Sequence, residues 1–216
     1  MSRKGLGLLA AVVIVAGCGS TTTSTKGSGK VVTVSRDVPS FTSVDLTAAA
    51  TVSVTVGKRT ALTISGDDNV VRLIRTDVRD GELVISSKHG YTTSHGLDIR
   101  IATPSLVGST MRGAGSLAAT GIRSKSFGVD VIGAGRLQLA GTTGSVDVNV
   151  AGVGAVELGR LLARDAHVEL SGTGQIHVYA THTLDATVDG VGSISYSGDP
   201  AHVRTHVSGL GAITAD

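Results

Sequence analysis

The chain has 216 residues with a formal net charge of +2, and it contains three tyrosines, two phenylalanines and no tryptophan. Without residues 1–17 it would lose two basic residues and no acidic one, leaving 17 of each sign. A neutral chain with few aromatic rings lacks the basic surface and the stacking groups of a nucleic-acid-binding protein, so we expect no nucleic-acid partner.

The N-terminus has the layout of a secretory signal. Arg3 and Lys4 precede an uncharged apolar run over residues 6–17, which ends in small residues. This order is typical of a cleaved signal peptide. The run is about 12 residues long, shorter than the roughly 20 that a membrane-spanning helix needs. We therefore predict a signal peptide over 1–17 and an exported protein.

Cys18, the only cysteine, directly follows the apolar run. Residues 15–18 resemble the bacterial lipobox, in which the cysteine thiol receives a diacylglycerol before cleavage. This resemblance implies lipidation of Cys18 and anchoring to the cell membrane or the outer membrane. Residues 18–30 are small and polar, so we expect them to form a flexible linker.

Residues 31–216 are rich in Val, Ile, Thr and Gly, and their apolar residues alternate with polar ones. An alternation of period two predicts β-strands. The region is long enough to bury one core, so we expect a single all-β domain.

A repeat of about 19 residues runs through residues 105–216. Its marker is a Gly-x-Gly triplet that begins at Gly113, Gly133, Gly152, Gly172, Gly190 and Gly209. The residue two positions before each first glycine is always apolar, and so is the residue four positions after it. A fainter copy lies at Val44, Leu46, Val52 and Val54, with Ala48 and Ala50 in place of the glycines.

A unit this short cannot enclose a core alone, so the repeats are expected to stack as coils of a single-stranded parallel β-helix, about 4.8 Å apart. A β-sandwich or a propeller is the alternative fold, but neither is built from repeats of a fixed length of about 19 residues. Each Gly-x-Gly would form a corner between strands, where glycine permits positive φ and a close approach of backbones.

The chain also resembles a known family, the putative auto-transporter adhesins with a head GIN domain. The resemblance covers roughly residues 38–215 and rests on the Gly-x-Gly repeats and on residues 41–46, 66–69 and 80–83. It implies an exported, all-β and often lipid-anchored protein with an adhesin-like role.

One polar face is the candidate binding site. Stacking would align the outward residues three and five positions before each first glycine, namely Asp130, Asp147, Asn149, His167 and Glu169. These groups would be close enough to converge on a cation or a glycan. The alternative is a solvated face that is polar because it discourages further sheet pairing.

No zinc-type histidine spacing, nucleophile elbow or phosphate loop is present, so we expect no cofactor, no metal and no enzyme activity. The sequence favours a lipid-anchored cell-envelope protein that binds an envelope glycan or a protein ligand, or that has a structural role. The alternative is a β-helix enzyme that acts on envelope or extracellular polysaccharide. The last repeat ends without an evident cap, so self-association through this C-terminal edge is also expected.

Overall fold

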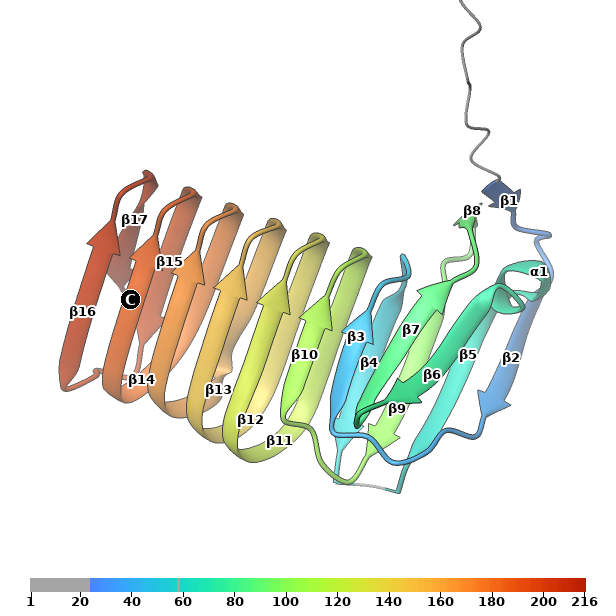
Figure 1. Ribbon diagram of the computed structural model, residues 1–216, viewed down its shortest axis with the longest axis horizontal. Helices are drawn as coiled ribbons and strands as arrows, with labels where there is room; N and C mark the ends of the chain where they lie inside the picture. Colours follow the sequence, from blue (N-terminus) through green and yellow to red (C-terminus); the bar gives the residue numbers. More distant parts are fainter. Residues whose placement is uncertain (1–23, 58) are drawn as a thin grey trace, which may run out of the picture.

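The computed structural model describes residues 24–57 and 59–216, and its regular structure is almost entirely β-strand. Figure 1 shows stacked coils along one axis, with shorter strands gathered at one end. The shorter elements are β1 (Ser24–Lys26), β2 (Val31–Arg36), β3 (Ser43–Leu46), β4 (Thr51–Val56), β5 (Ala61–Asp67), α1 (Asp68–Val71), β6 (Ile74–Arg79), β7 (Glu82–Ser87), β8 (Gly90–Thr92) and β9 (Asp98–Thr103). The coils contain β10 (Gly108–Met111), β11 (Ala114–Val131), β12 (Ala134–Val150), β13 (Val153–Leu170), β14 (Thr173–Val188), β15 (Val191–Ser197), β16 (His202–Val207) and β17 (Leu210–Ala215). Within the described ranges, no helix is long and apolar enough to cross a membrane.

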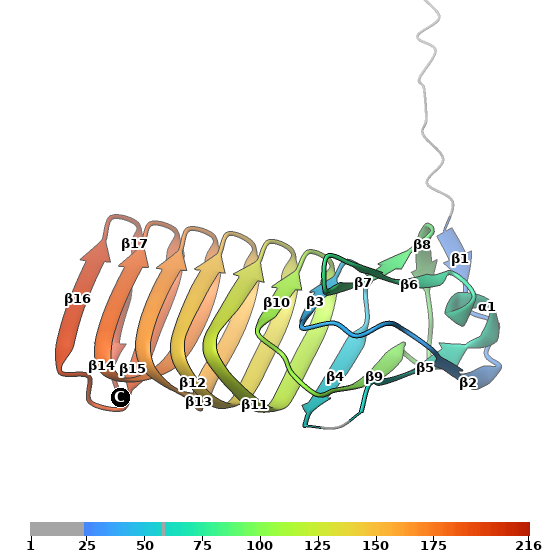
Figure 2. The same ribbon diagram turned by 60° about the horizontal axis from the view of Figure 1, so that its bottom comes forward.

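Equivalent repeat positions pair in parallel from coil to coil. The apolar residues that follow the corners form one ladder through Leu117, Leu137, Val156, Ile176, Ile194 and Ile213. The apolar residues that precede the corners form a second ladder through Met111, Val131, Val150, Leu170, Val188 and Val207. Figure 2 shows each coil as two walls joined by a turn at one end. The predicted parallel β-solenoid is therefore confirmed.

The alternation of apolar and polar residues places the core between the two walls. In β12, Val146, Val148 and Val150 are buried, whereas the intervening Asp147 and Asn149 are exposed. Full burial of each such aliphatic side chain contributes about 1.5–3 kcal/mol. Because every coil adds inward residues from both walls, the core is continuous along the solenoid.

Glycine is required at the corners because neighbouring coils approach closely there. A Cβ on Gly152 would lie 2.5 Å from the carbonyl oxygen of Ile132 and closer still to that of Gly133. The expectation of positive φ at these corners is wrong in general: among the twelve paired glycines, only Gly135 and Gly192 have a positive φ. Steric exclusion of Cβ is therefore the dominant reason for the repeat.

The fainter repeat forms the first coil, because β3 pairs with β10 and β4 pairs with β11. Beyond it, β7 and β9 continue the two walls in parallel. The antiparallel strands β6, β5 and β2 then close this end. The region expected to be solenoid over 31–216 thus begins with a cap of antiparallel strands.

The expected linker over 18–30 extends too far. Its last part, residues 24–30, lies on the domain, where β1 pairs with β8 and the Gly27 N–H donates to the Thr92 carbonyl at 2.7 Å. Polar contacts from α1 also hold this segment, and a composition of small polar residues gave no sign of them. The signal peptide predicted over 1–17 and Cys18 lie outside the described residues.

The C-terminal end presents β16 and β17 as its last strands. Every residue of β16 is exposed, and Leu210 at the start of β17 is 78% exposed. Self-association through this edge stays a prediction.

Candidate ligand-binding sites

The five residues of the predicted polar face lie on the outer side of the strands that precede the corners. Asp130, Asn149 and Glu169 are neighbours in one row across three coils. Asp147 and His167 are neighbours in a second row. The register places Asp147 and Glu169 on adjacent coils as the repeat predicts, and whether the face binds a ligand stays a prediction.

This face does not gather metal ligands. Within residues 24–57 and 59–216, no group of three or more His, Cys, Asp or Glu side chains is placed to hold a metal ion. Asp147 and His167 line a shallow hollow of about 260 Å³ together with Asp165 and Asp185. The other three residues of the predicted set do not line it.

Asp165, which also lines this shallow hollow, already has a hydrogen-bond partner. Its Oδ1 atom lies 2.8 Å from Nδ1 of His182, and this hydrogen bond is the main cause that lowers the pKa of the Asp165 carboxyl. The His182 ring stands edge-on to His202, with ring centroids 5.5 Å apart. These contacts stabilise the wall and leave fewer free groups for a ligand.

A larger hollow lies on the other wall, where the coils differ in length. Between the aligned pairs Gln138–Glu157 and Ala140–Arg160, β13 contains one residue more than β12. A further shift separates β13 from β14 after Leu158. Extra residues that cannot join the ladder bend the strand outward as a bulge. The irregular wall here encloses a hollow of about 380 Å³, which we call the flank hollow.

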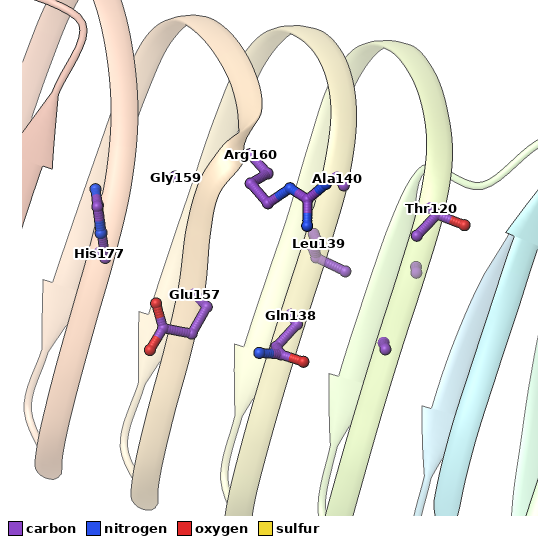
Figure 3. A pocket seen from close by; sticks show the side chains of 10 residues that line it. Thr120, Gln138, Leu139, Ala140, Glu157, Gly159, Arg160 and His177 are labelled. Atoms are coloured by element: carbon purple, nitrogen blue, oxygen red, sulfur yellow. The ribbon is translucent and has the colours of Figure 1, made fainter.

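Five hydrogen-bonding side chains from four coils line the flank hollow (Figure 3): Thr120, Gln138, Glu157, Arg160 and His177. The exposed Arg160 extends from its coil toward Ala140 of the neighbouring coil. Gly159 leaves room for the imidazole, because a Cβ there would lie 3.0 Å from Cε1 and Nε2 of His177. The remaining lining is mostly small or aliphatic, and this mixture is typical of ligand pockets of about 300–1,000 Å³.

No sequence motif marks the flank hollow, because its polar residues occupy ordinary outward positions of the repeat. One signal was present in the sequence. The spacing of the glycine pairs changes from 20 residues between Gly152 and Gly172 to 18 between Gly172 and Gly190. Neighbouring coils of unequal length must break register somewhere, and the break lies beside this hollow.

Comparison with known proteins identifies relatives. The model of the family described as "Putative auto-transporter adhesin, head GIN domain" matches residues 40–200. A search of the curated proteins finds no match. A crystal structure of a putative adhesin from Bacteroides fragilis is 28% identical, with a TM-score of 0.71, and the match covers 88% of this chain and 99% of that one.

Two more distant structures share the fold. One, from Parabacteroides distasonis, is described as a putative lipid binding protein; it is 21% identical, with a TM-score of 0.55, and the match covers 90% of this chain and 100% of that one. The other is a putative adhesin from Parabacteroides merdae. It is 17% identical, with a TM-score of 0.55, and the match covers 89% of this chain and 99% of that one.

Proposed function

Because the chain belongs to the family of putative auto-transporter adhesins with a head GIN domain, we propose that it is a non-enzymatic, lipid-anchored surface module that binds an external ligand. Family membership supports an exported or surface protein with an adhesin-like role, as does the similarity to the Bacteroides fragilis adhesin. The lipid anchor and the ligand site go beyond what family membership supports and are part of this proposal.

The observation that carries the binding function is the flank hollow. It combines a carboxylate, an amide, a guanidinium and an imidazole over an apolar floor, and its side chains come from several coils. A ligand held there would contact a rigid wall, since the parallel ladder fixes the backbone on both sides of the bulge. Rigid supports reduce the entropy lost on binding.

The alternative function, a carbohydrate-active enzyme, has less support from the same geometry. Most glycosidases place two carboxyl groups on either side of the bond to be cleaved. Glu157 is the one carboxylate among the described residues that line the flank hollow. A site with a single carboxylate fits binding better than hydrolysis.

The proposed anchor sets an orientation for the molecule. Residues 18–23 can span at most about 20 Å when fully extended, and Ser24 begins β1 at the capped end of the solenoid (Figure 1). A lipid on Cys18 would therefore hold the cap close to the membrane. The C-terminal coils lie at the opposite end and would be accessible to ligands outside the cell.

Lipidation of Cys18 predicts that cells fed a palmitate analogue incorporate the label into the wild-type protein. The variant Cys18→Ser should carry no label and should leave the membrane fraction, because no thiol remains for acylation. In-gel detection after fractionation measures both outcomes. An unlabelled wild-type protein found free in the medium would contradict the anchor.

The binding function predicts that Arg160→Ala weakens attachment in a surface-display screen against envelope glycans and matrix proteins. Loss of a charged hydrogen-bond donor should reduce affinity by about tenfold or more. Arg164→Ala is the matched control, because it removes the same charge from the same strand at a position outside the hollow. Equal binding by both variants would remove the flank hollow from the proposal.

A further inference from the structure

We propose that the flank hollow continues into a second hollow at the C-terminal end, and that together they form a groove for a neutral oligosaccharide. This inference rests on the proposed binding function and names its class of ligand. The second hollow measures about 520 Å³, and Tyr179, Tyr196, Asp199 and Asp216 are among its lining residues. Two of the three tyrosines in a chain without tryptophan thus meet in one place.

Local structure leaves both tyrosine rings partly uncovered. Tyr196 in β15 packs against the core, and the residue stacked beside it in β17 is the small Ala215. Tyr179 in β14 lies against the turn after β15, where a Cβ on Gly198 would be 2.9 Å from the ring atom Cζ. Gly198 also has a φ of 96°, so glycine suits this turn for two reasons.

A polar contact joins the two hollows. The Nε2 atom of His177 lies 3.3 Å from both the Ser197 hydroxyl and Oδ2 of Asp216. His177 lines the flank hollow, whereas Ser197 and Asp216 line the second one. The linings of the two hollows therefore meet at His177, where an elongated ligand would cross from one hollow to the other.

The composition of this groove fits a sugar chain. The apolar C–H face of a sugar ring packs on a phenol ring, and its hydroxyl groups both donate and accept hydrogen bonds. Carboxylates at Glu157, Asp199 and Asp216 supply acceptors, and the amide of Gln138 supplies both donors and acceptors. A groove that combines such groups with two partly exposed rings matches a polyhydroxylated ligand.

The charge of the groove selects against anionic ligands. Three carboxylates face one guanidinium, that of Arg160, and one imidazole that is paired with Asp216. Phosphate headgroups and uronic acids would be repelled by this excess of negative charge. We therefore expect a neutral glycan in preference to an acidic polysaccharide or an anionic lipid.

Ring-labelled tyrosine gives a direct test by NMR, because the chain has only three tyrosine rings to follow. The probes are hexa-N-acetylchitohexaose, cellohexaose and mannohexaose, with polygalacturonate as the anionic comparison. At least one neutral probe should shift the signals of Tyr179 and Tyr196. Tyr91 is the internal control, because its hydroxyl donates to the Ala49 carbonyl in the N-terminal cap. Single Tyr→Phe variants assign the signals.

Tyr179→Ala should then weaken binding of that probe by about tenfold, the loss expected for one ring contact, while the circular dichroism spectrum shows that the solenoid is still folded. If no neutral probe moves the Tyr179 and Tyr196 signals, or polygalacturonate moves them more, the inference is wrong. The proposed binding function would survive that result if Arg160→Ala, but not Arg164→Ala, weakened attachment in the display screen. Failure of both experiments would overturn both proposals.

Discussion

Gly152→Val should lower the free energy of unfolding by more than about 3 kcal/mol, and Gly172→Val should have a similar effect. A Cβ on Gly172 would lie 2.6 Å from the carbonyl oxygen of Ala151 and closer still to that of Gly152. The obstructing atoms belong to the backbone of a ladder that is paired on both sides, so no side-chain rotation can relieve the overlap. Urea unfolding followed by circular dichroism measures the loss.

Gly128→Val is the matched control. Gly128 lies in the same stacked walls, yet a Cβ there meets no atom within 4 Å, and its φ is not positive. Its substitution should change stability by less than about 0.5 kcal/mol. Gly144 is unsuitable as a control although it lies outside the repeat pairs, because its Cβ would be 2.5 Å from the Lys125 carbonyl oxygen. Similar losses at Gly128 and Gly152 would refute the close-approach explanation.

The solenoid could be predicted because every coil needs apolar residues at the same inward positions and room for a close backbone contact at its corner. The atoms nearest to a Cβ placed on each corner glycine belong to the preceding coil. The first coil differs from the later ones, because its corner has Ala48 and Ala50 where they have glycine. Residues 47–50 are stacked against no earlier corner among the described strands, because β7 and β9, which precede them in the two walls, are connected by the longer segment 88–97. Alanine is therefore tolerated there, which explains why this copy of the repeat is faint.

The flank hollow and the N-terminal contacts could not be predicted in the same way. The hollow depends on where coils of unequal length break register, and the spacing of glycines does not place that break within a coil. The segment of residues 24–30 has no apolar periodicity. It is held by contacts with residues about 40 positions later in the chain, such as the Ser28 hydroxyl with Asp68 and the Asn69 amide with the Lys26 carbonyl. Local patterns contain no information about such pairings.

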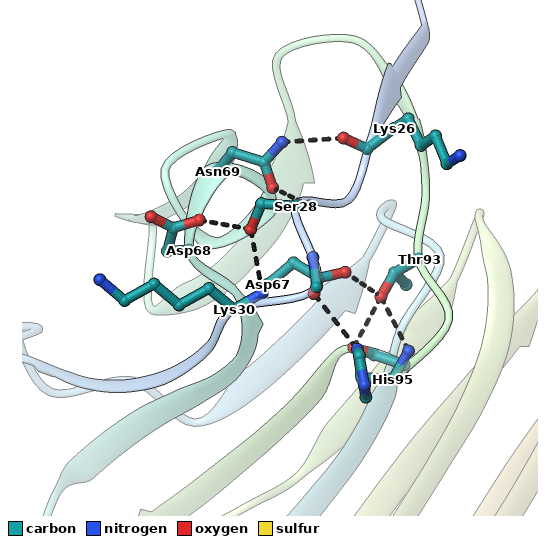
Figure 4. Close-up of polar contacts among 10 residues, drawn as sticks. Lys26, Ser28, Lys30, Asp67, Asp68, Asn69, Thr93 and His95 are labelled. Carbon is teal, nitrogen blue, oxygen red and sulfur yellow. Dashed lines mark hydrogen bonds and ion pairs between the residues drawn. The ribbon is translucent and has the colours of Figure 1, made fainter.

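Asp67 is the centre of these N-terminal contacts (Figure 4). Its carboxylate is buried, accepts a hydrogen bond from the Thr93 hydroxyl at 2.6 Å and one from the Gly29 N–H at 3.0 Å, and lies 3.3 Å from Nδ1 of His95. The backbone passes so close that a Cβ on Gly27 would be 2.8 Å from Cγ of Asp67. The hydrogen bond from Thr93 is the main cause that lowers the pKa of this carboxyl.

Acid should therefore release residues 24–30 from the cap before the coils unfold. A lowered pKa in the folded state means that the ionised carboxylate stabilises the fold above the ordinary carboxyl pKa of about 3.9. That stabilisation is lost as the pH falls through the folded-state value. Amide exchange of Gly29, expressed as a protection factor, should fall over this range while the amides of β12 stay protected.

Asp67→Asn should produce the same release at neutral pH. The substituted amide has one oxygen and one NH₂ group, so it cannot accept from Thr93 and Gly29 through separate oxygen atoms as the carboxylate does. Protection of the Gly29 amide should drop by about tenfold or more, the loss expected for one buried hydrogen bond to a charged group. Asp77→Asn makes the same charge change at an exposed position of β6 and should leave that amide protected. If Asp67→Asn keeps wild-type protection at Gly29 and loses none on acidification, the carboxylate does not hold this segment, and the contacts of Asp68 and Asn69 suffice.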